Sequence, residues 1–147
     1  MDRRRLLLCA LGGVLALKGT TTLAARRALI TVYKNPSCGC CGGWVAHMQS
    51  AGFDLKVIEV GDLTPHRRRL GIPDNLASCH TAEVGGYSVE GHVPAVDVRR
   101  LLRERPNALG LAVPGMVPGS PGMSGTPVPY ATLLVDRNGR AREFERH

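Results

Sequence analysis

The stretch ALITVYKNPSCGCCGGWVAHMQSAG, residues 28–52, carries the signals that decide the fold of this chain. Its first seven residues are rich in β-branched side chains and are followed by Asn35 and Pro36, which predicts a strand over residues 28–34. Residues 42–51 have the composition of a helix, and the glycine that follows them is a common stop signal. Three cysteines lie between these two elements, in the tetrapeptide CGCC. The sequence therefore predicts a cysteine-rich loop that leads from a strand into a helix.

The next residues extend this pattern to strand, helix, strand, helix. Residues 53–61 alternate between apolar and polar side chains, which predicts a second strand. Residues 62–73 then supply Thr64 as a candidate N-cap, a proline at the first helical position and Gly71 as a stop, which together predict a short helix. A strand–helix–strand unit of this kind predicts a parallel pair of strands.

The second half of the chain predicts one more helix and a closing hairpin. Residues 95–106 place apolar side chains on one face and arginines on the other, as in an amphipathic helix. Residues 113–130 are rich in proline and glycine and predict a long loop. Asn138 and Gly139 separate two β-like runs in residues 131–146, which is a strong hairpin signal. The sequence therefore predicts an α/β, thioredoxin-like fold: a small mixed sheet with flanking helices and a C-terminal β-hairpin.

Two further expectations follow from a thioredoxin-like outline. The loop after the first strand is where such folds carry reactive cysteines, which matches the position of residues 38–41. A cis-proline opposite this loop is also expected, and Pro94 and Pro129 are the two candidates. We favour Pro129, because it leads directly into the predicted hairpin.

Length and composition fit a single small domain. The chain has 147 residues, of which 44% are hydrophobic and 21% charged, so one core is expected. Its formal net charge is +7, and arginines such as those in the run at residues 66–69 contribute to it. Aromatic side chains are not interleaved with these arginines, as a nucleic-acid interface would require. We therefore interpret the arginines as solvated helix faces and exclude nucleic acid as a partner.

The N-terminus has the features of an export signal. A basic start, MDRRR, precedes an apolar run at residues 6–17 and a set of small residues. The apolar run is shorter than the roughly 20 residues of a membrane-spanning helix, although an uncleaved anchor is the alternative. We predict a signal peptide that covers approximately residues 1–25, a single domain over residues 28–147, periplasmic localisation and no membrane span after cleavage. The arginine pair at positions 3 and 4 leaves the Tat and Sec routes both open.

Cleavage would leave four cysteines, and three interpretations of them stay open. Cys40 and Cys41 are adjacent, so two purely structural disulfides would crowd one turn. Cys38 and Cys41 have the spacing of a CxxC redox pair, and the positive end of the following helix favours the reactive thiolate form. A third thiol, that of Cys40, would compete to resolve any mixed disulfide formed by such a pair. A soft cation, in contrast, is bound more tightly with every added thiolate, including that of Cys79. The spacing therefore indicates thiol redox chemistry, metal binding or both.

Further soft or borderline ligands lie in the second half of the chain. Cys79, His80 and His92 fall among short β-like runs, and the triplet Pro-Gly-Met occurs twice in the predicted loop, ending at Met116 and Met123. Exposed thioethers suit Cu(I) and bind Zn²⁺ poorly. The alternatives are a surface histidine, a buried free cysteine and methionines that pack over apolar surface. We treat all five residues as candidate metal ligands.

Three segments carry a resemblance to a known family: YKNPSCGCCGGWVAHM, SCHTAEVGGYSVEGHVPA and GLAVPGMVPGSPGM. They closely resemble the CopG-like family of exported bacterial copper-resistance proteins, long catalogued as a domain of unknown function, and the likeness extends from about residue 30 to the C-terminus. This resemblance implies a thioredoxin-like fold in which cysteines bridge a multinuclear Cu(I) cluster. Carried over by position, the resemblance implies that the cluster ligands are Cys38, Cys40, Cys41 and Cys79. The roles of the histidines and methionines are inferred from their donor atoms alone.

These observations lead to a first hypothesis and an alternative. The first is a periplasmic Cu(I)-binding protein in copper resistance and homeostasis, with copper ions as its cofactor and other periplasmic copper-handling proteins as partners. The alternative is a thiol-disulfide or copper-cycling oxidoreductase, in which Cys38 and Cys41 are the catalytic pair. A third hypothesis, an exported domain held together by two structural disulfides, stays open.

Overall fold

The computed structural model describes residues 27–147. The predicted signal peptide, residues 1–25, lies outside the described residues. Within them the chain forms seven strands, three α-helices and one short 3₁₀ helix. In chain order these elements are β1 (Leu29–Lys34), α1 (Gly39–Ser50), β2 (Asp54–Glu59), α2 (Thr64–Leu70), η1 (Asp74–Leu76), β3 (His80–Val84), β4 (Tyr87–Gly91), α3 (Ala95–Glu104), β5 (Gly110–Val113), β6 (Ala131–Val135) and β7 (Ala141–Arg146).

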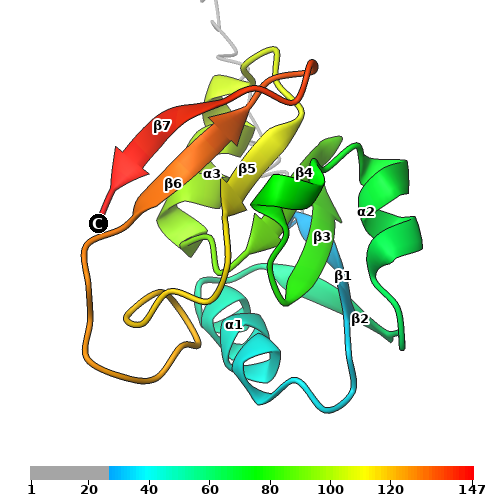
Figure 1. The fold of residues 1–147 in the computed structure, drawn as a ribbon, viewed down its shortest axis with the longest axis vertical. Coiled ribbons are helices and arrows are strands. Elements are labelled where there is room, and N and C mark those ends of the chain that lie inside the picture. Colours follow the sequence, from blue (N-terminus) through cyan, green and yellow to red (C-terminus); the bar gives the residue numbers. More distant parts are fainter. Residues whose placement is uncertain (1–26) are drawn as a thin grey trace, which may run out of the picture.

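The strands form one mixed sheet in the order β2-β1-β3-β4-β5-β6-β7 (Figure 1). β1 pairs in parallel with β2, as the strand–helix–strand pattern predicts, and β6 and β7 form the predicted antiparallel hairpin. β4 and β5 are a second parallel pair, connected through α3. The prediction of a mixed α/β fold with a C-terminal hairpin is confirmed, and the thioredoxin-like assignment stays a prediction.

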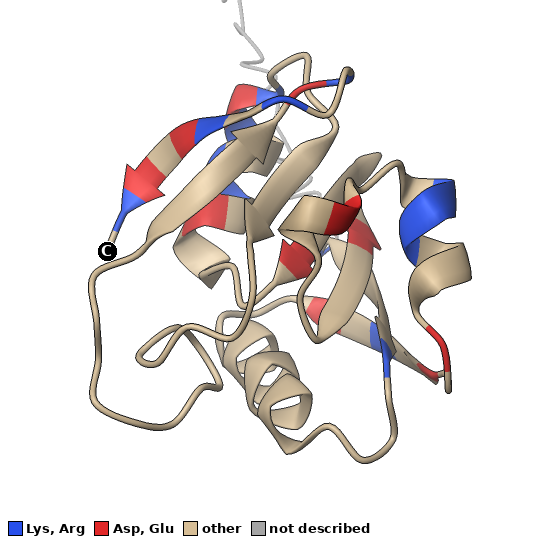
Figure 2. Cartoon of the chain, viewed as in Figure 1, with Lys and Arg blue, Asp and Glu red and all other residues tan. Residues whose placement is uncertain are grey.

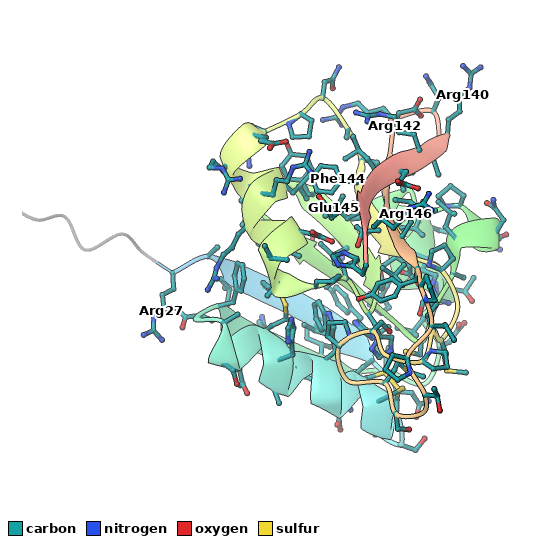
Figure 3. The ribbon with its side chains drawn as sticks, turned by 90° about the vertical axis from the view of Figure 1, so that its left-hand side faces the viewer. Arg27, Arg140, Arg142, Phe144, Glu145 and Arg146 are labelled. Carbon is teal, nitrogen blue, oxygen red and sulfur yellow. A yellow bond between two sulfur atoms is a disulfide. The ribbon has the colours of Figure 1, made fainter. Side chains whose placement is uncertain are left out.

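Helices cover both faces of this sheet (Figures 1 and 3). α1 and α3 pack on the face that holds the main core, to which they contribute Trp44 and Leu101. α2 lies over the other face, next to a smaller apolar cluster that includes Ile72. Because side chains alternate along a strand, His80 points toward α1, whereas its neighbour Thr81 points toward the α2 face.

Two helix starts differ from the prediction. α1 begins at Gly39, three residues earlier than the expected start at residue 42, because its packing on the core outweighs the poor helix propensity of its glycines. Thr64 is the first residue of α2 instead of its N-cap, and its N–H donates to the Asp62 side chain at 2.8 Å. Gly71 ends α2 in the left-handed conformation, with φ of 73°, as predicted.

The predicted cis-proline is wrong, because none of the peptide bonds in residues 27–147 is cis. Pro129 lies in an exposed stretch before β6, and Pro94 directly precedes α3. The segment that ends at Pro94 nevertheless contacts the cysteine helix. The carbonyl oxygen of Val93 accepts a hydrogen bond of 2.8 Å from Trp44 Nε1. The Val93–Pro94 peptide bond that carries this carbonyl is trans, as most X-Pro bonds are.

Charged side chains are unevenly distributed over the molecule (Figure 2). α1 and residues 113–130 contain none, whereas α2 and β7 are rich in them. Figure 3 shows Arg140, Arg142 and Arg146 on or beside β7, at the edge of the sheet. Of the helices in residues 27–147, none has the length and apolar character needed to cross a membrane. Because α1 contains no Lys, Arg, Asp or Glu, its cysteines lie in the uncharged part of the molecule.

Candidate metal centre

The turn before α1 brings three cysteines to the N-terminal end of the helix. The Asn35 side-chain oxygen accepts hydrogen bonds from the N–H and the hydroxyl of Ser37, at 3.0 and 2.6 Å, and the Asn35 carbonyl accepts one from the Cys38 N–H at 3.1 Å. Such local bonding favours a turn over a continued strand. Cys38 takes the N-cap position, and Cys40 and Cys41 fall in the first helical turn. All three residues therefore lie at the positive end of the helix dipole.

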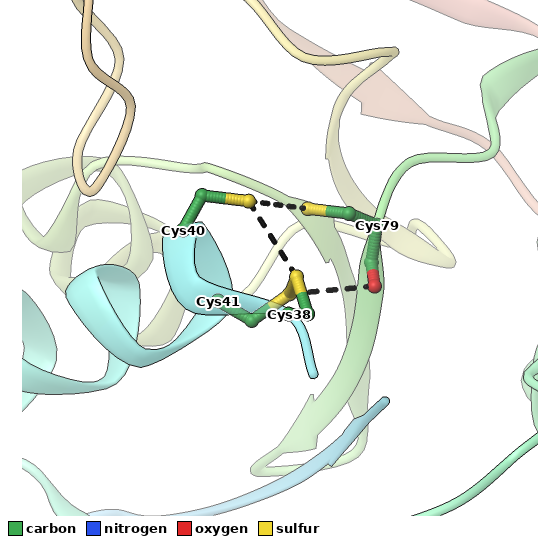
Figure 4. Close-up of side chains that lie close together, drawn as sticks. All are labelled: Cys38, Cys40, Cys41 and Cys79. Carbon is green, nitrogen blue, oxygen red and sulfur yellow. Dashed lines mark hydrogen bonds between the residues drawn. A yellow bond between two sulfur atoms is a disulfide. The ribbon is translucent and has the colours of Figure 1, made fainter. Parts of the chain in front are cut away.

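Four sulfur atoms from two segments of the chain meet at this helix end (Figure 4). Cys38 and Cys41 are joined by a disulfide, and Cys40 and Cys79 are free thiols. Cys40 Sγ lies 3.5 Å from Cys38 Sγ and 3.8 Å from Cys79 Sγ. The four sulfurs all lie within 4.8 Å of one another. The structure thus brings together the four predicted cysteines, with one disulfide instead of the two that a stapled domain would have, and their role as ligands stays a prediction.

Two histidines also approach Cys79. Cys79 Sγ lies 2.8 Å from His92 Nε2 and 3.6 Å from His80 Nδ1. His92 Nδ1 is 2.7 Å from the carbonyl oxygen of Pro121, which can only accept, so in the neutral ring Nδ1 carries the proton and Nε2 presents its lone pair to the sulfur. His80 packs against Trp44 and His92, with ring centroids 4.5 and 5.0 Å away. Cys79 and the two histidines form a second group whose ligand atoms lie within 4.8 Å.

Burial favours the neutral forms of these donors. Burial, followed by the charge of the neighbouring Cys40, raises the pKa of Cys79 to about 12. Burial lowers the pKa of His80 to about 3 and also lowers the pKa of His92. His80 Nε2 is buried and has no hydrogen-bond partner within residues 27–147. A cation that binds here therefore meets two neutral imidazoles, but it must displace the proton of Cys79.

The first Pro-Gly-Met triplet lies beside the segment that carries Cys79. The Gly115 N–H donates to the Ala77 carbonyl at 3.2 Å, and the Ser78 hydroxyl donates to the Gly115 carbonyl oxygen. Met116 follows directly and is 62% exposed. Its thioether is thus accessible to solvent one residue from this anchor, and its role as a ligand stays a prediction.

The second triplet lies against the cysteine helix. Gly122 has φ of 86°, and an added Cβ would lie 2.4 Å from the backbone nitrogen of Trp44 and 2.6 Å from the carbonyl oxygen of Cys40. The Met123 N–H donates to the Ser120 carbonyl at 2.9 Å, which closes a turn, and its side chain is half-buried. The loop therefore packs on the first turns of α1, and the role of Met123 as a ligand also stays a prediction.

Sequence reasoning missed two charged residues, Arg67 and Glu90, that bond to Ser78, the residue before Cys79. Arg67 belongs to the basic run interpreted as solvated, yet its side chain is only 15% exposed and its Nε lies 2.9 Å from Glu90 Oε1. Glu90 Oε1 also accepts the Ser78 N–H at 2.6 Å. The one available signal was a glutamate in YSVEG, a run that otherwise reads as a buried strand. The sequence does not reveal which arginine of the run meets it.

The fold and the site together define an α/β protein with a candidate site for a soft metal ion. The donors of this site are four sulfurs and two neutral imidazoles. Two solved structures, described as "Copper resistance protein copG- Form 2" and "Copper resistance protein copG- Form 1", each match with a TM-score of 0.78 and 38% sequence identity. Each match covers 82% of this chain and 98% of the other. The chain therefore belongs to the CopG-like family of copper-resistance proteins, as its resemblance predicts.

Two other comparisons complete this assignment. Residues 76–123, which include Cys79 and both histidines of the site, match the family described as "Protein of unknown function, DUF411". No match was found among curated proteins. The family thus indicates copper resistance, and the cysteine cluster is the candidate metal site.

Proposed function

We propose that the protein is an exported, periplasmic Cu(I)-binding protein that contributes to copper resistance by holding copper on Cys38, Cys40, Cys41 and Cys79. One observation carries the proposal: four sulfurs lie within 4.8 Å, three from the start of α1 and one from the segment before β3. Thiolates are soft donors and favour Cu(I) over hard cations. Membership of the copper-resistance family supports copper as the metal.

Copper loading on all four sulfurs requires a reduced protein. The Cys38–Cys41 disulfide must take up two electrons and two protons to give two thiols. Each thiol then releases a proton when it binds copper as a thiolate. A thiolate can bridge two Cu(I) ions, so three cysteines in one turn suit a multinuclear cluster better than a single ion.

The nitrogen and thioether donors extend the site beyond the four sulfurs. His92 Nε2 and His80 Nδ1 lie next to Cys79 Sγ and would bind copper at that end of the site. Met116 and Met123 belong to the loop that packs beside both cysteine segments. Thioethers bind Cu(I) without losing a proton, so these methionines would add soft donors for which protons do not compete.

A specific observation also supports the oxidoreductase alternative. Cys38 and Cys41 form a disulfide at a helix N-terminus, and the free Cys40 Sγ lies 3.5 Å from Cys38 Sγ. In a copper-cycling reaction, two Cu(II) ions would each take one electron from the reduced pair. Two thiols would then become one disulfide, with release of two protons and two Cu(I) ions. Repeated turnover with Cu(II) and a dithiol would distinguish this enzyme from a binding protein, which stops after one stoichiometric uptake.

Anaerobic titration of the reduced protein with Cu(I), in competition with a chromophoric Cu(I) chelator, tests the proposal. We expect several Cu(I) ions per chain, protection of the thiols from alkylation, and a loss of capacity on Cys→Ser substitution at each of the four positions. Ser50→Ala, an exposed change at the other end of α1, is the control and should bind as the wild type does. Wild-type binding no tighter than that of the Cys→Ser variants, or ready displacement of Cu(I) by Zn²⁺, would refute the proposal. Fractionation of cells that express the full chain tests its location.

A further inference from the structure

Of the four clustered cysteines, Cys79 is the one that no helix holds. It lies between η1 and β3, and the residue before it, Ser78, takes part in an isolated bridge with Gly115. Cys79 Sγ nevertheless lies 3.8 Å from Cys40 Sγ and 2.8 Å from His92 Nε2. A sulfur in a connecting segment needs a rigid backbone to keep such distances, because loops are otherwise the more mobile parts of a fold.

An ion pair between α2 and β4 holds the backbone of Ser78. Glu90 Oε1 accepts the Ser78 N–H at 2.6 Å and Arg67 Nε at 2.9 Å. Arg67 Nη2 donates to the carbonyl oxygen of Ser78. Both backbone polar groups of Ser78 are therefore bonded to the same ion pair, which we call the Arg67–Glu90 clamp.

Stability alone is a weak explanation for this clamp. The Glu90 side chain is 1% exposed and that of Arg67 is 15% exposed, so both charges have lost most of their water. The desolvation of such a pair often offsets its attraction, and apolar residues of similar volume can be as stable. An apolar pair could not, however, bond to the N–H and the carbonyl of Ser78. The clamp therefore contributes orientation that packing could not supply.

We propose that the Arg67–Glu90 clamp is a positioning device for Cys79, which fixes the preceding residue so that the sulfur stays within reach of copper held by the cysteines of α1. The inference rests on the proposed copper-binding function. Neither charged side chain is a candidate ligand in this proposal, and both act through Ser78. Groups that orient metal ligands in this way typically change metal affinity by about 10- to 100-fold when they are removed.

The double variant Arg67→Met/Glu90→Leu tests the proposal, because it removes the clamp without leaving an unpaired buried charge. We expect a folded protein whose Cu(I) affinity is lower by about tenfold or more. In a Cys79→Ser background the same double change should cause no further loss, whereas a general effect on the fold would lower affinity equally in both backgrounds. The matched control is Arg69→Met/Glu83→Leu, which removes a more exposed ion pair of 3.0 Å between α2 and β3.

A second measurement needs no copper. With the Cys38–Cys41 disulfide intact, dibromobimane can bridge the two free thiols, Cys40 and Cys79, and its fluorescence reports the rate. Bridging should be slower in the clamp variant than in the wild type and the control. If bridging is slower in the clamp variant than in the wild type and the control, but wild-type protein binds no Cu(I), the proposed function fails while the clamp stands.

Two results would overturn the clamp itself. One is a folded double variant with wild-type bridging rate and wild-type Cu(I) affinity. The other is an equal loss of affinity in the Cys79→Ser background. If the double variant does not fold, Arg67→Lys replaces it, and it is again compared with and without the Cys79→Ser change. Lysine keeps the charge beside Glu90 but cannot also present a guanidinium fork to Ser78.

Discussion

The packing of the loop of residues 114–130 on α1 gives a sharp prediction, since glycines meet on both sides of the contact. A Cβ on Gly122 would lie 2.4 Å from the backbone nitrogen of Trp44 and 2.6 Å from the carbonyl oxygen of Cys40. A Cβ on Gly43 would lie 2.9 Å from Gly122 Cα. These are backbone atoms, which cannot yield unless α1 or the loop moves. Gly122→Ala should therefore lift the loop from the start of the cysteine helix.

Two contributions set the size of the effect. A residue with a Cβ costs about 1–2 kcal/mol in the left-handed region that Gly122 occupies. A displaced loop would also break the hydrogen bond of 2.7 Å between His92 Nδ1 and the Pro121 carbonyl, at about 1 kcal/mol. We therefore expect the free energy of unfolding to fall by about 2–3 kcal/mol. Cu(I) affinity should fall as well, because His92 loses the bond that fixes its tautomer.

Urea unfolding followed by far-UV circular dichroism measures this loss, and Gly86→Ala is its matched control. Gly86 lies in the β3–β4 turn with φ of 87°, and an added Cβ would meet no atom within 4 Å. It should show the backbone cost alone, about 1–2 kcal/mol, with unchanged copper binding. If both variants lost equal stability and bound Cu(I) as the wild type does, the tight contact between the loop and α1 would be refuted.

Three other outcomes are expected. Trp44→Phe removes the indole N–H that bonds to a buried carbonyl, and it should lower the free energy of unfolding by about 1–3 kcal/mol in the same urea assay. The hydrogen bond from Arg69 lowers the pKa of Glu83 below its ordinary value of 4.5, so its stabilising contribution is present above about pH 4.5 and is lost as the pH falls through the lower folded pKa. Glu83→Gln should therefore make stability less sensitive to acid in this range, and an unchanged acid profile would contradict the assignment. Protein with the Cys38–Cys41 disulfide intact should bind fewer Cu(I) ions than reduced protein, and a dithiol should restore the difference in a titration; equal capacity would exclude both sulfurs as ligands.

The first half of the fold could be predicted because its signals are local. The β-branched run before Asn35 and the alternation in residues 53–61 fix β1 and β2 and their parallel pairing. The start of α1 could not be placed, because Gly39, Gly42 and Gly43 have low helix propensity and only packing of the helix on the core holds them helical. Local propensity fails at the point where tertiary contacts decide the structure.

The cysteine site was predictable to different extents on its two sides. Cys38, Cys40 and Cys41 are neighbours in the sequence, so their proximity needs no fold. The approach of Cys79 was expected from the family resemblance and from the need for a fourth donor. The clamp could not be predicted, because three consecutive arginines point about 100° apart around a helix and only the sheet decides that Arg67 faces inward.

Under the proposed function, the charge around the site should favour several monovalent copper ions over one zinc ion. α1 and residues 113–130 contain no lysine or arginine that could balance four thiolates. Arg67, which bonds to the carbonyl of Ser78, is already paired with Glu90. A single Zn²⁺ would leave the site with a net negative charge in a partly buried region, where such charge is poorly solvated. Several bridged Cu(I) ions would neutralise the thiolates more completely, and His80 and His92 add donors without adding charge. Burial raises the pKa of Cys79 to about 12, so protons compete with copper for this sulfur and copper binding should strengthen as the pH rises.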